Sequence, residues 1–108
     1  MAMTKITDEF LRYMRYEKNR SPLTVKAYHD DLLDFETFFT DRDEALTWQT
    51  VDADIIRDWM EHMMERGNKS ASVNRRLSAV KMLFRFALSR HLVERDQAHM
   101  LEGPKNEK

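Results

Sequence analysis

The sequence is poor in the residues that disulfides, metal sites and tight turns require. Its 108 residues include no cysteine, two glycines and two prolines. Without cysteine there are no disulfides or thiolate metal sites, and the histidines at positions 29, 62, 91 and 99 show no ligand spacing. We therefore expect no metal site. The scarcity of turn-forming residues disfavours a strand-rich fold.

Long apolar runs and enzymatic motifs are missing as well. No stretch approaches the roughly 18 apolar residues of a membrane span, and the N-terminus lacks the apolar segment of a signal peptide. This predicts a cytoplasmic protein without a membrane partner. Two glycines cannot build a Gly-rich phosphate loop, and no serine stands in a nucleophile motif. We expect no catalytic residues and no cofactor, so a small enzyme is the least favoured reading.

Helix-forming residues are plentiful, and their apolar spacing predicts an all-α fold of four helices. Short connections between them predict a bundle of two crossed helical hairpins, and Leu92 onward leaves open a short fifth helix. Gly103-Pro104 interrupts helicity, so we assign residues 1–102 to one domain and 103–108 to the start of a linker. The predicted helices cover residues 4 or 7 to 18, 21 to 40, 53 to 66, and 70 to 89.

Helix start and stop signals set these boundaries. Ser21 is a cap residue followed by proline at the first helical position, and Gly67 suits the position after a helix. Trp48, in the connection between the second and third helices, is expected in the core. The other expected caps are Thr4 or Thr7 for the first helix, Asp52 for the third, and Ser70 or Ser72 for the fourth.

Charge is distributed unevenly along the chain, although the net charge is only −1. Residues 30–65 hold twelve Asp/Glu against two Lys/Arg, whereas residues 69–93 hold six Lys/Arg and no Asp/Glu. The fourth predicted helix therefore has an apolar stripe and a separate stripe of cationic and amide groups. A helix of this kind suits a polyanion, with double-stranded DNA as the leading candidate partner.

Candidate DNA-binding residues lie at two helix starts and along the fourth helix. Free backbone N–H groups and nearby cations at a helix start can hold a phosphate, while Arg and Asn side chains can pair with guanine and adenine. An alternative reading is a helical protein–protein interaction domain whose basic face meets an acidic partner. The candidates taken from the residues themselves are Ser21, Lys26, Lys69, Ser70, Asn74, Arg75, Ser78, Lys81 and Arg85.

Two segments resemble the N-terminal core-binding domain of tyrosine recombinases, the phage-type integrases and Xer-like resolvases. The first, from Ser21, has the pattern Ser-Pro-x-Thr, a tyrosine four residues on, and an acidic-Leu-x-x-Phe segment. The second, from Asn74, has the pattern Asn-Arg-x-Leu-Ser-x-x-Lys followed by aromatics. The resemblance covers about residues 5 to 105.

The resemblance implies a SAM-like four-helix domain that forms half of a clamp around duplex DNA. It adds Thr24 to the candidate DNA contacts and also implies Ser21, Asn74, Arg75, Ser78 and Lys81. Other recombinase protomers in a synaptic complex are the further partners implied. Family catalysis resides in a larger C-terminal domain, so this chain is expected to bind DNA without cutting it.

Overall fold

The computed structural model describes residues 5–105 and confirms an all-α fold. Helix α1 spans Lys5–Arg12 and continues as a π-helix, η1, over Tyr13–Glu17. Three longer α-helices follow, and the described part of the chain contains no strand. None of the described helices has the length and apolarity needed to traverse a bilayer. The longer helices are α2 (Pro22–Arg42), α3 (Ala53–Glu65) and α4 (Ser70–Ser89).

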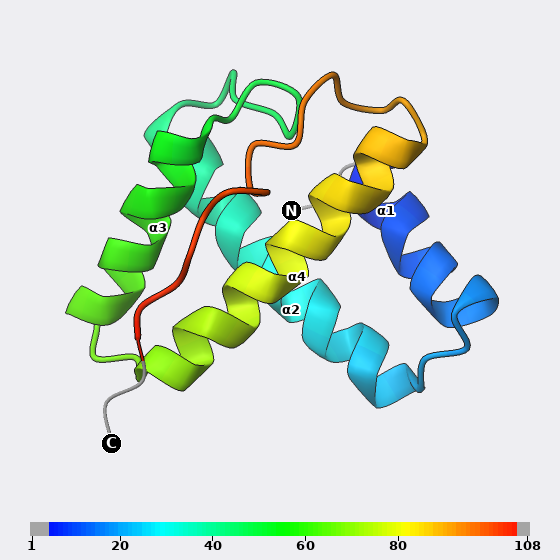
Figure 1. Cartoon of the computed structure of the whole chain (residues 1–108), viewed down its shortest axis with the longest axis horizontal. Helices are drawn as coiled ribbons and strands as arrows, with labels where there is room; N and C mark the ends of the chain where they lie inside the picture. Colours follow the sequence, from blue (N-terminus) through cyan, green and yellow to red (C-terminus); the bar gives the residue numbers. More distant parts are fainter. Residues whose placement is uncertain (1–4, 106–108) are drawn as a thin grey trace.

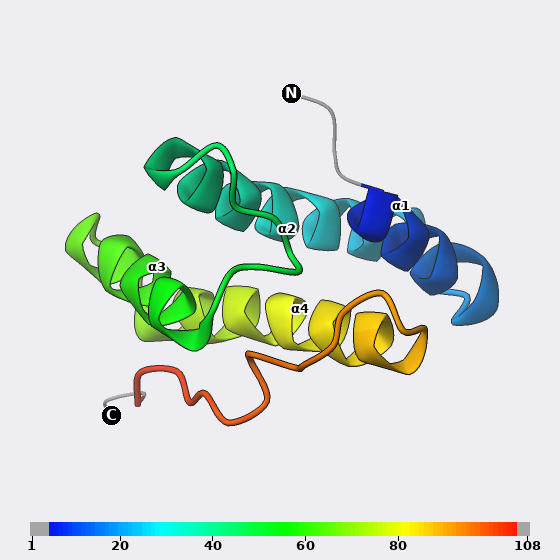
Figure 2. The ribbon, with the colours of Figure 1, turned by 90° about the horizontal axis from the view of Figure 1, so that it is seen from above.

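The helices form two hairpins that cross each other, as the sequence predicted. Helix α1 lies beside the first half of α2, and α3 leads into α4 at the opposite end of the molecule (Figure 1). Seen from above, α1 and α2 form one layer and α4 lies across them in the other (Figure 2). Helices α2 and α4 therefore contact each other at the centre of the fold, and α1 and α3 each contact both of them.

Three of the predicted helix signals act as expected. The Thr24 backbone N–H donates to Ser21 Oγ (3.2 Å), and Pro22 occupies the first turn of α2. The Ile55 N–H donates to Asp52 Oδ1 (3.0 Å) at the start of α3. Gly67, with φ +91°, follows α3 in the left-handed conformation that glycine adopts without a steric cost.

Three of the candidate cap residues do not cap a helix, and a fourth lies outside the described residues. Lys69 occupies the N-cap of α4 without a side-chain bond, whereas Ser70 is the first helical residue and Ser72 lies in the first turn. Thr7 is buried inside α1, where its hydroxyl donates to Glu36 Oε1 (2.8 Å). Thr4 lies outside the described residues. Capping residues also serve as interior hydrogen-bond donors, so sequence alone could not separate the two uses.

The first helix and the end of the chain also differ from expectation. A single α-helix to residue 18 was predicted, but its last turn is the π-helix η1. No fifth helix is present between Arg90 and Lys105, where the structure describes turns, bends and irregular chain. This segment returns along the side of α4 that faces away from α2 (Figure 2), and it buries Val93, Ala98 and Leu101. These apolar residues contribute to the core although their segment is not helical, so their burial gave no helical spacing that the sequence could show.

Two tryptophans and three phenylalanines fill the centre between the hairpins. Trp48 is 1 % exposed, as predicted, and its indole N–H donates to the buried Glu36 carboxylate. Phe35 lies within 5.4 Å of Trp48 and 4.8 Å of Trp59, measured between ring centroids. This aromatic cluster, completed by Phe39 and Phe84, fixes the crossing of α2 and α4 and so positions their exposed faces.

Candidate nucleic-acid interface

Helix α4 exposes one narrow stripe. Apolar residues are buried on two of its sides, against the other helices and against the C-terminal segment. Arg75, Ser78 and Arg85 are exposed, and Lys81 is half-buried between them. The structure thus brings four of the predicted residues together on one helix face. We call this face, defined by Arg75, Ser78, Lys81 and Arg85, the α4 stripe.

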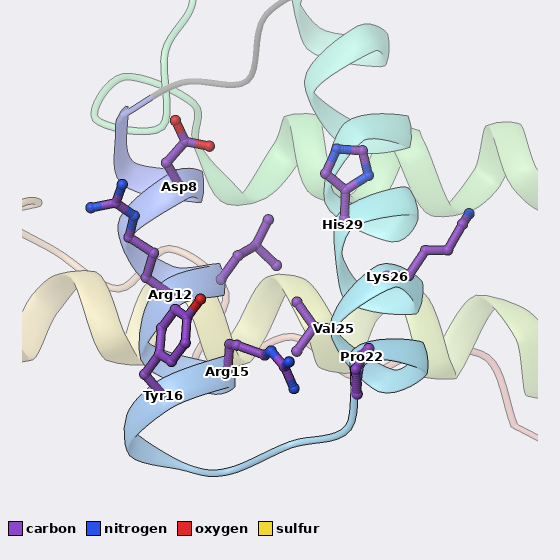
Figure 3. A pocket seen from close by; sticks show the side chains of 9 residues that line it. Asp8, Arg12, Arg15, Tyr16, Pro22, Val25, Lys26 and His29 are labelled. Atoms are coloured by element: carbon purple, nitrogen blue, oxygen red, sulfur yellow. The ribbon is translucent and has the colours of Figure 1, made fainter.

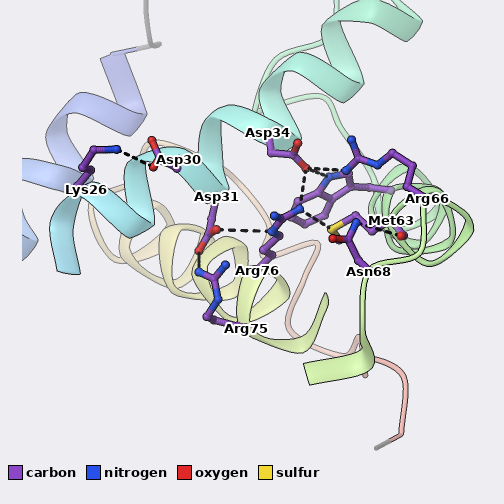
Figure 4. Close-up of polar contacts among 10 residues, drawn as sticks. Lys26, Asp30, Asp31, Asp34, Met63, Arg66, Asn68, Arg75 and Arg76 are labelled. Atoms are coloured by element: carbon purple, nitrogen blue, oxygen red, sulfur yellow. Dashed lines mark hydrogen bonds and ion pairs between the residues drawn. The ribbon is translucent and has the colours of Figure 1, made fainter. Parts of the chain in front are cut away.

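One member of the α4 stripe is held by an acidic residue of α2. Arg75 Nη1 donates to Asp31 Oδ2 at 2.6 Å, where the two helices cross (Figure 4). The Asp31 side chain is 5 % exposed, whereas that of Arg75 is 54 % exposed. Burial raises the pKa of Asp31 above its ordinary value, although the neighbouring Arg75 and Arg76 guanidinium groups oppose this rise. Arg75 is consequently positioned by the fold and still faces solvent.

A second acidic residue of α2, Asp34, contacts polar side chains of α3, α4 and the turn between them. Asp34 Oδ2 accepts a hydrogen bond from Trp59 Nε1 at 2.9 Å and lies 3.8 Å from Arg76 Nη1 and 3.7 Å from Arg66 Nη2. The Arg76 side chain is 25 % exposed and also contacts Met63 Sδ. Arg76 therefore helps to hold α2, α3 and α4 together rather than extending the α4 stripe (Figure 4).

Asn74 is turned away from the α4 stripe and toward the C-terminal segment. Its amide nitrogen donates to Pro104 O at 2.6 Å and to Ser70 O at 3.0 Å. Both of its amide hydrogens are therefore used within the protein. A Cβ atom on Gly103 would lie only 1.8 Å from Asn74 Oδ1, so glycine permits this close approach. In the structure Asn74 thus anchors residues 103–104.

The start of α2 offers fewer donors than the sequence suggested. Pro22 has no N–H, the Thr24 N–H is bonded to Ser21 Oγ, and the Val25 N–H is bonded to Ser21 O. The Ser21 hydroxyl also donates to Thr24 Oγ1 at 3.0 Å. A phosphate at this end would have to compete with these bonds for most of the donors.

Lys26, one turn further along α2, has an acidic partner of its own. Its ammonium lies 3.0 Å from Asp30 Oδ2, and this contact, with that from His29, lowers the pKa of Asp30. Both side chains of the pair are more than half exposed. An exposed pair of this kind is weak. Lys26 can therefore exchange Asp30 for a stronger anion.

The start of α4 is different because no side chain caps it. Lys69 is exposed and Ser70 is half-buried, and the first bond of the helix runs from Val73 N–H to Lys69 O. The three preceding N–H groups carry the positive end of the helix dipole beside the Lys69 ammonium. Of the two predicted helix starts, this one retains the features that favour an anion.

Sequence reasoning missed the acidic residues that position these cations. Asp31 and Glu36 belong to the acidic run of residues 30–65, and both are buried. The signal was present, because Asp31 lies on the same helix face as the apolar residues Leu32 and Phe35 that flank it in the fold. Within residues 5–105, no group of three or more His, Cys, Asp or Glu side chains is arranged to hold a metal ion.

The comparisons with known proteins identify the family. The family described as phage integrase, N-terminal SAM-like domain, matches residues 7–91. The chain belongs to this family. The two motifs that carried the resemblance meet physically at the crossing of α2 and α4, where Asp31 of the first binds Arg75 of the second. Among solved structures there is no match.

Curated relatives are Xer-type tyrosine recombinases. The chain is 37 % identical over 101 residues to tyrosine recombinase XerD of Bradyrhizobium diazoefficiens, covering 94 % of this chain and 31 % of the relative. It is 30 % identical over 100 residues to tyrosine recombinase XerC of Natranaerobius thermophilus, covering 93 % of this chain and 33 % of the relative. The chain therefore spans about a third of the length of these relatives.

Proposed function

We propose that this chain binds duplex DNA as the N-terminal domain of a site-specific tyrosine recombinase. The observation that carries the proposal is the α4 stripe, which shows cations and a hydroxyl to solvent and contains no acid. A row of cations on one helix face matches the regular phosphates of a duplex, and a helix fits the major groove. Membership of the phage integrase family supports the same function.

The contacts divide into two kinds. Lys69, Lys81 and Lys26 are proposed to hold phosphates, because an ammonium is a compact charge without fixed directionality. Arg75 and Arg85 carry planar guanidinium groups that can form paired hydrogen bonds with guanine, and Arg75 is already oriented by Asp31. Ser70 and Ser78 supply neutral polar contacts in this proposal, whereas Ser21, Thr24 and Asn74 would have to exchange their internal hydrogen bonds for contacts with DNA.

The relatives suggest where this domain acts. They are named as tyrosine recombinases and are about three times as long as this chain. We propose that residues 1–102 form the DNA-binding domain, that 103–108 begin a linker, and that the full protein works with other protomers on one recombination site. The part described here then supplies binding and leaves strand cleavage to other parts of the recombinase.

DNA binding is tested by reversing two charges of the α4 stripe. Lys81→Glu with Arg85→Glu should weaken binding to a labelled duplex, measured by fluorescence anisotropy over a series of salt concentrations. If about five cations contact phosphates, the wild-type log–log slope is about −4.5, and losing two contacts reduces it to about −2.7. Between 50 and 200 mM salt, affinity should then fall about 500-fold for wild type and about 40-fold for the variant.

A matched control carries the same charge change elsewhere. Arg57→Glu with Arg95→Glu reverses two exposed arginines outside α4 and should retain most of the salt slope. Circular dichroism verifies that both variants are folded. Equal binding by the wild type and the α4 variant, or a wild-type slope near zero, would refute DNA binding and favour the alternative of an acidic protein partner.

Cleavage is tested separately. Tyr13 and Tyr28 are half-buried among aromatic side chains, and Tyr16 is 75 % exposed but lies outside the α4 stripe. A tyrosine that attacks a phosphate must lie beside the cations that hold that phosphate. Arg15 lies beside Tyr16, but the α4 stripe that is proposed to hold the DNA does not. Incubation with a nicked duplex should therefore give no covalent adduct on a denaturing gel. An adduct that disappears in Tyr16→Phe would contradict this assignment.

A further inference from the structure

A second basic surface lies between the first hairpin's two helices. Helix α1, η1 and the first half of α2 enclose an open groove with a volume of about 540 Å³ (Figure 3). In that view α4 runs behind the two helices, so the groove opens on the face that points away from α4. The residues that line it are Asp8, Leu11, Arg12, Arg15, Tyr16, Pro22, Val25, Lys26 and His29.

The groove combines excess positive charge with an apolar floor. Arg12 and Arg15 lie on one wall, and neither has a carboxylate partner among residues 5–105. On the other wall, Lys26 and His29 share the Asp30 carboxylate. Among residues 5–105, Asp8 is the only acidic side chain that lines the groove. Its charge therefore rests mainly on two arginines without internal partners.

The apolar part of the groove comes from both walls. Leu11 and Val25 are half-buried and line the groove from α1 and α2, with Pro22 at one end. Tyr16 is 75 % exposed at the same end, and the Arg15 guanidinium carbon lies 5.9 Å from the centre of its ring. An exposed aromatic ring beside a concave apolar surface provides the kind of anchor found at protein–protein contacts.

The backbone at this wall is unusual. Tyr16 and Arg15 belong to the π-helix η1, where the Lys18 N–H donates to Tyr13 O at 3.0 Å. Single π-turns are rare and often occur at functional sites, because they rotate side chains away from the positions that an α-helix would give them. Here the π-turn accompanies the exposure of Tyr16 at the mouth of the groove.

We propose that this groove binds an acidic peptide segment of a partner protein, with an apolar side chain seated between Leu11 and Val25. Glutamate or aspartate side chains of the peptide would pair with Arg12 and Arg15. The lining of the groove fits a peptide better than DNA. A duplex presents a row of phosphates and no apolar side chain that could fill the concave apolar floor.

The experiment uses this chain and two short fluorescein-labelled peptides. In one peptide glutamates alternate with leucines, and in the other lysines replace the glutamates. Fluorescence anisotropy should show binding of the acidic peptide only, and a version with serine in place of leucine should bind more weakly. Arg12→Glu with Arg15→Glu should reduce affinity for the acidic peptide about tenfold or more, because two attractions become repulsions.

DNA titrations with the same proteins separate this proposal from the proposed function. The Arg12/Arg15 double variant should keep its duplex affinity within about threefold of wild type. A change of that size is what screened, long-range repulsion between the new carboxylates and the DNA would cause. The Lys81/Arg85 double variant should show the reverse, with peptide binding retained and DNA binding lost. Circular dichroism and a milder Arg12→Gln with Arg15→Gln variant exclude misfolding as the cause.

Two results would overturn the groove proposal. One is failure of the acidic peptide to bind wild type, or equal binding by the Arg12/Arg15 variants. The other is a loss of duplex affinity in these variants as large as that in the Lys81/Arg85 variant, which would make the groove part of the DNA surface. The first result does not depend on whether the α4 stripe binds DNA, so failure of the groove proposal can be told apart from failure of the proposed function.

Discussion

Gly103→Ala tests how the C-terminal segment is fixed to α4. Gly103 has no left-handed backbone conformation, so alanine is compatible with its torsions. The difficulty is space, since the added Cβ would lie 1.8 Å from Asn74 Oδ1 and 2.9 Å from Asn74 Cγ. The Asn74 side chain would have to swing away and give up its bonds to Pro104 O and Ser70 O.

The expected cost follows from these two hydrogen bonds. Each contributes about 0.5–1.5 kcal/mol, so losing both costs about 1–3 kcal/mol. Replacing glycine by alanine restricts the unfolded chain and returns about 0.4–1 kcal/mol. Gly103→Ala should therefore lower the free energy of unfolding by up to about 2.6 kcal/mol. The direction of the change in stability is the informative result, because alanine at a position with free space would stabilise the protein rather than destabilise it.

A double-mutant cycle with Asn74→Ala isolates the contact. Asn74→Ala alone loses the same hydrogen bonds and leaves space beside Gly103. Adding Gly103→Ala in that background should then be neutral or stabilising by up to about 1 kcal/mol, so the effect of the same substitution changes sign. Urea denaturation followed by circular dichroism measures all four proteins. A stabilising Gly103→Ala in the wild-type background would refute the close approach and, with it, the anchoring role of Asn74.

Four further predictions concern the residues that shape the fold and the α4 stripe. Burial raises the pKa of Asp31 above its ordinary value of 3.8. The stability of wild type relative to Asp31→Asn should therefore be greatest below pH 3.8 and decrease as the pH rises through the raised pKa. Denaturation of both proteins over a pH series measures this difference in stability, and a difference that grows with pH would contradict the prediction. The same variant removes the partner that orients Arg75 and should weaken duplex binding in an anisotropy titration, whereas unchanged or tighter binding would contradict the positioning role of Asp31. Leu77→Ala and Trp59→Ala should each lower the free energy of unfolding in urea by about 2–5 kcal/mol, because both side chains are buried. A decrease below about 0.5 kcal/mol for either variant would show that its side chain is not in the core. Ser21→Ala should cost about 1 kcal/mol in the same assay through loss of the α2 cap, and an unchanged midpoint would contradict the role of that cap.

The helices were predictable because their signals are local. Ser21-Pro22, Asp52 and Gly67 each act within a few residues, and each marks the boundary that it predicted. The end of α4 lacked such a signal, since the left-handed position after this helix is occupied by His91, with φ +60°, rather than by glycine. The course of residues 90–105 depends on contacts with α4, and these cannot be recognised from periodicity.

The candidate site was predictable only in part. Helical spacing placed Asn74, Ser78, Lys81 and Arg85 on one face with Arg75 beside them, and in the structure Arg75 shares an exposed face with the last three. Spacing could not show that Asn74, at the edge of this face, is covered by Pro104, because that contact joins residues 30 apart in sequence. The groove between α1 and α2 was missed because two helices contribute its charges and a π-turn sets the position of Tyr16.

The pairing of Asp31 with Arg75 shows how one contact can serve both the fold and the proposed DNA surface. A buried carboxylate is costly, and the raised pKa of Asp31 indicates that its arginine partners do not fully compensate for burial. A hydrophobic pair of the same size would hold the crossing of α2 and α4 with less cost. The charged pair does something that a hydrophobic pair cannot, because it keeps a half-exposed guanidinium in a fixed position on the α4 stripe. We therefore interpret Asp31 as a positioning residue for DNA binding, for which the pH series and the DNA titration of Asp31→Asn provide two independent measurements.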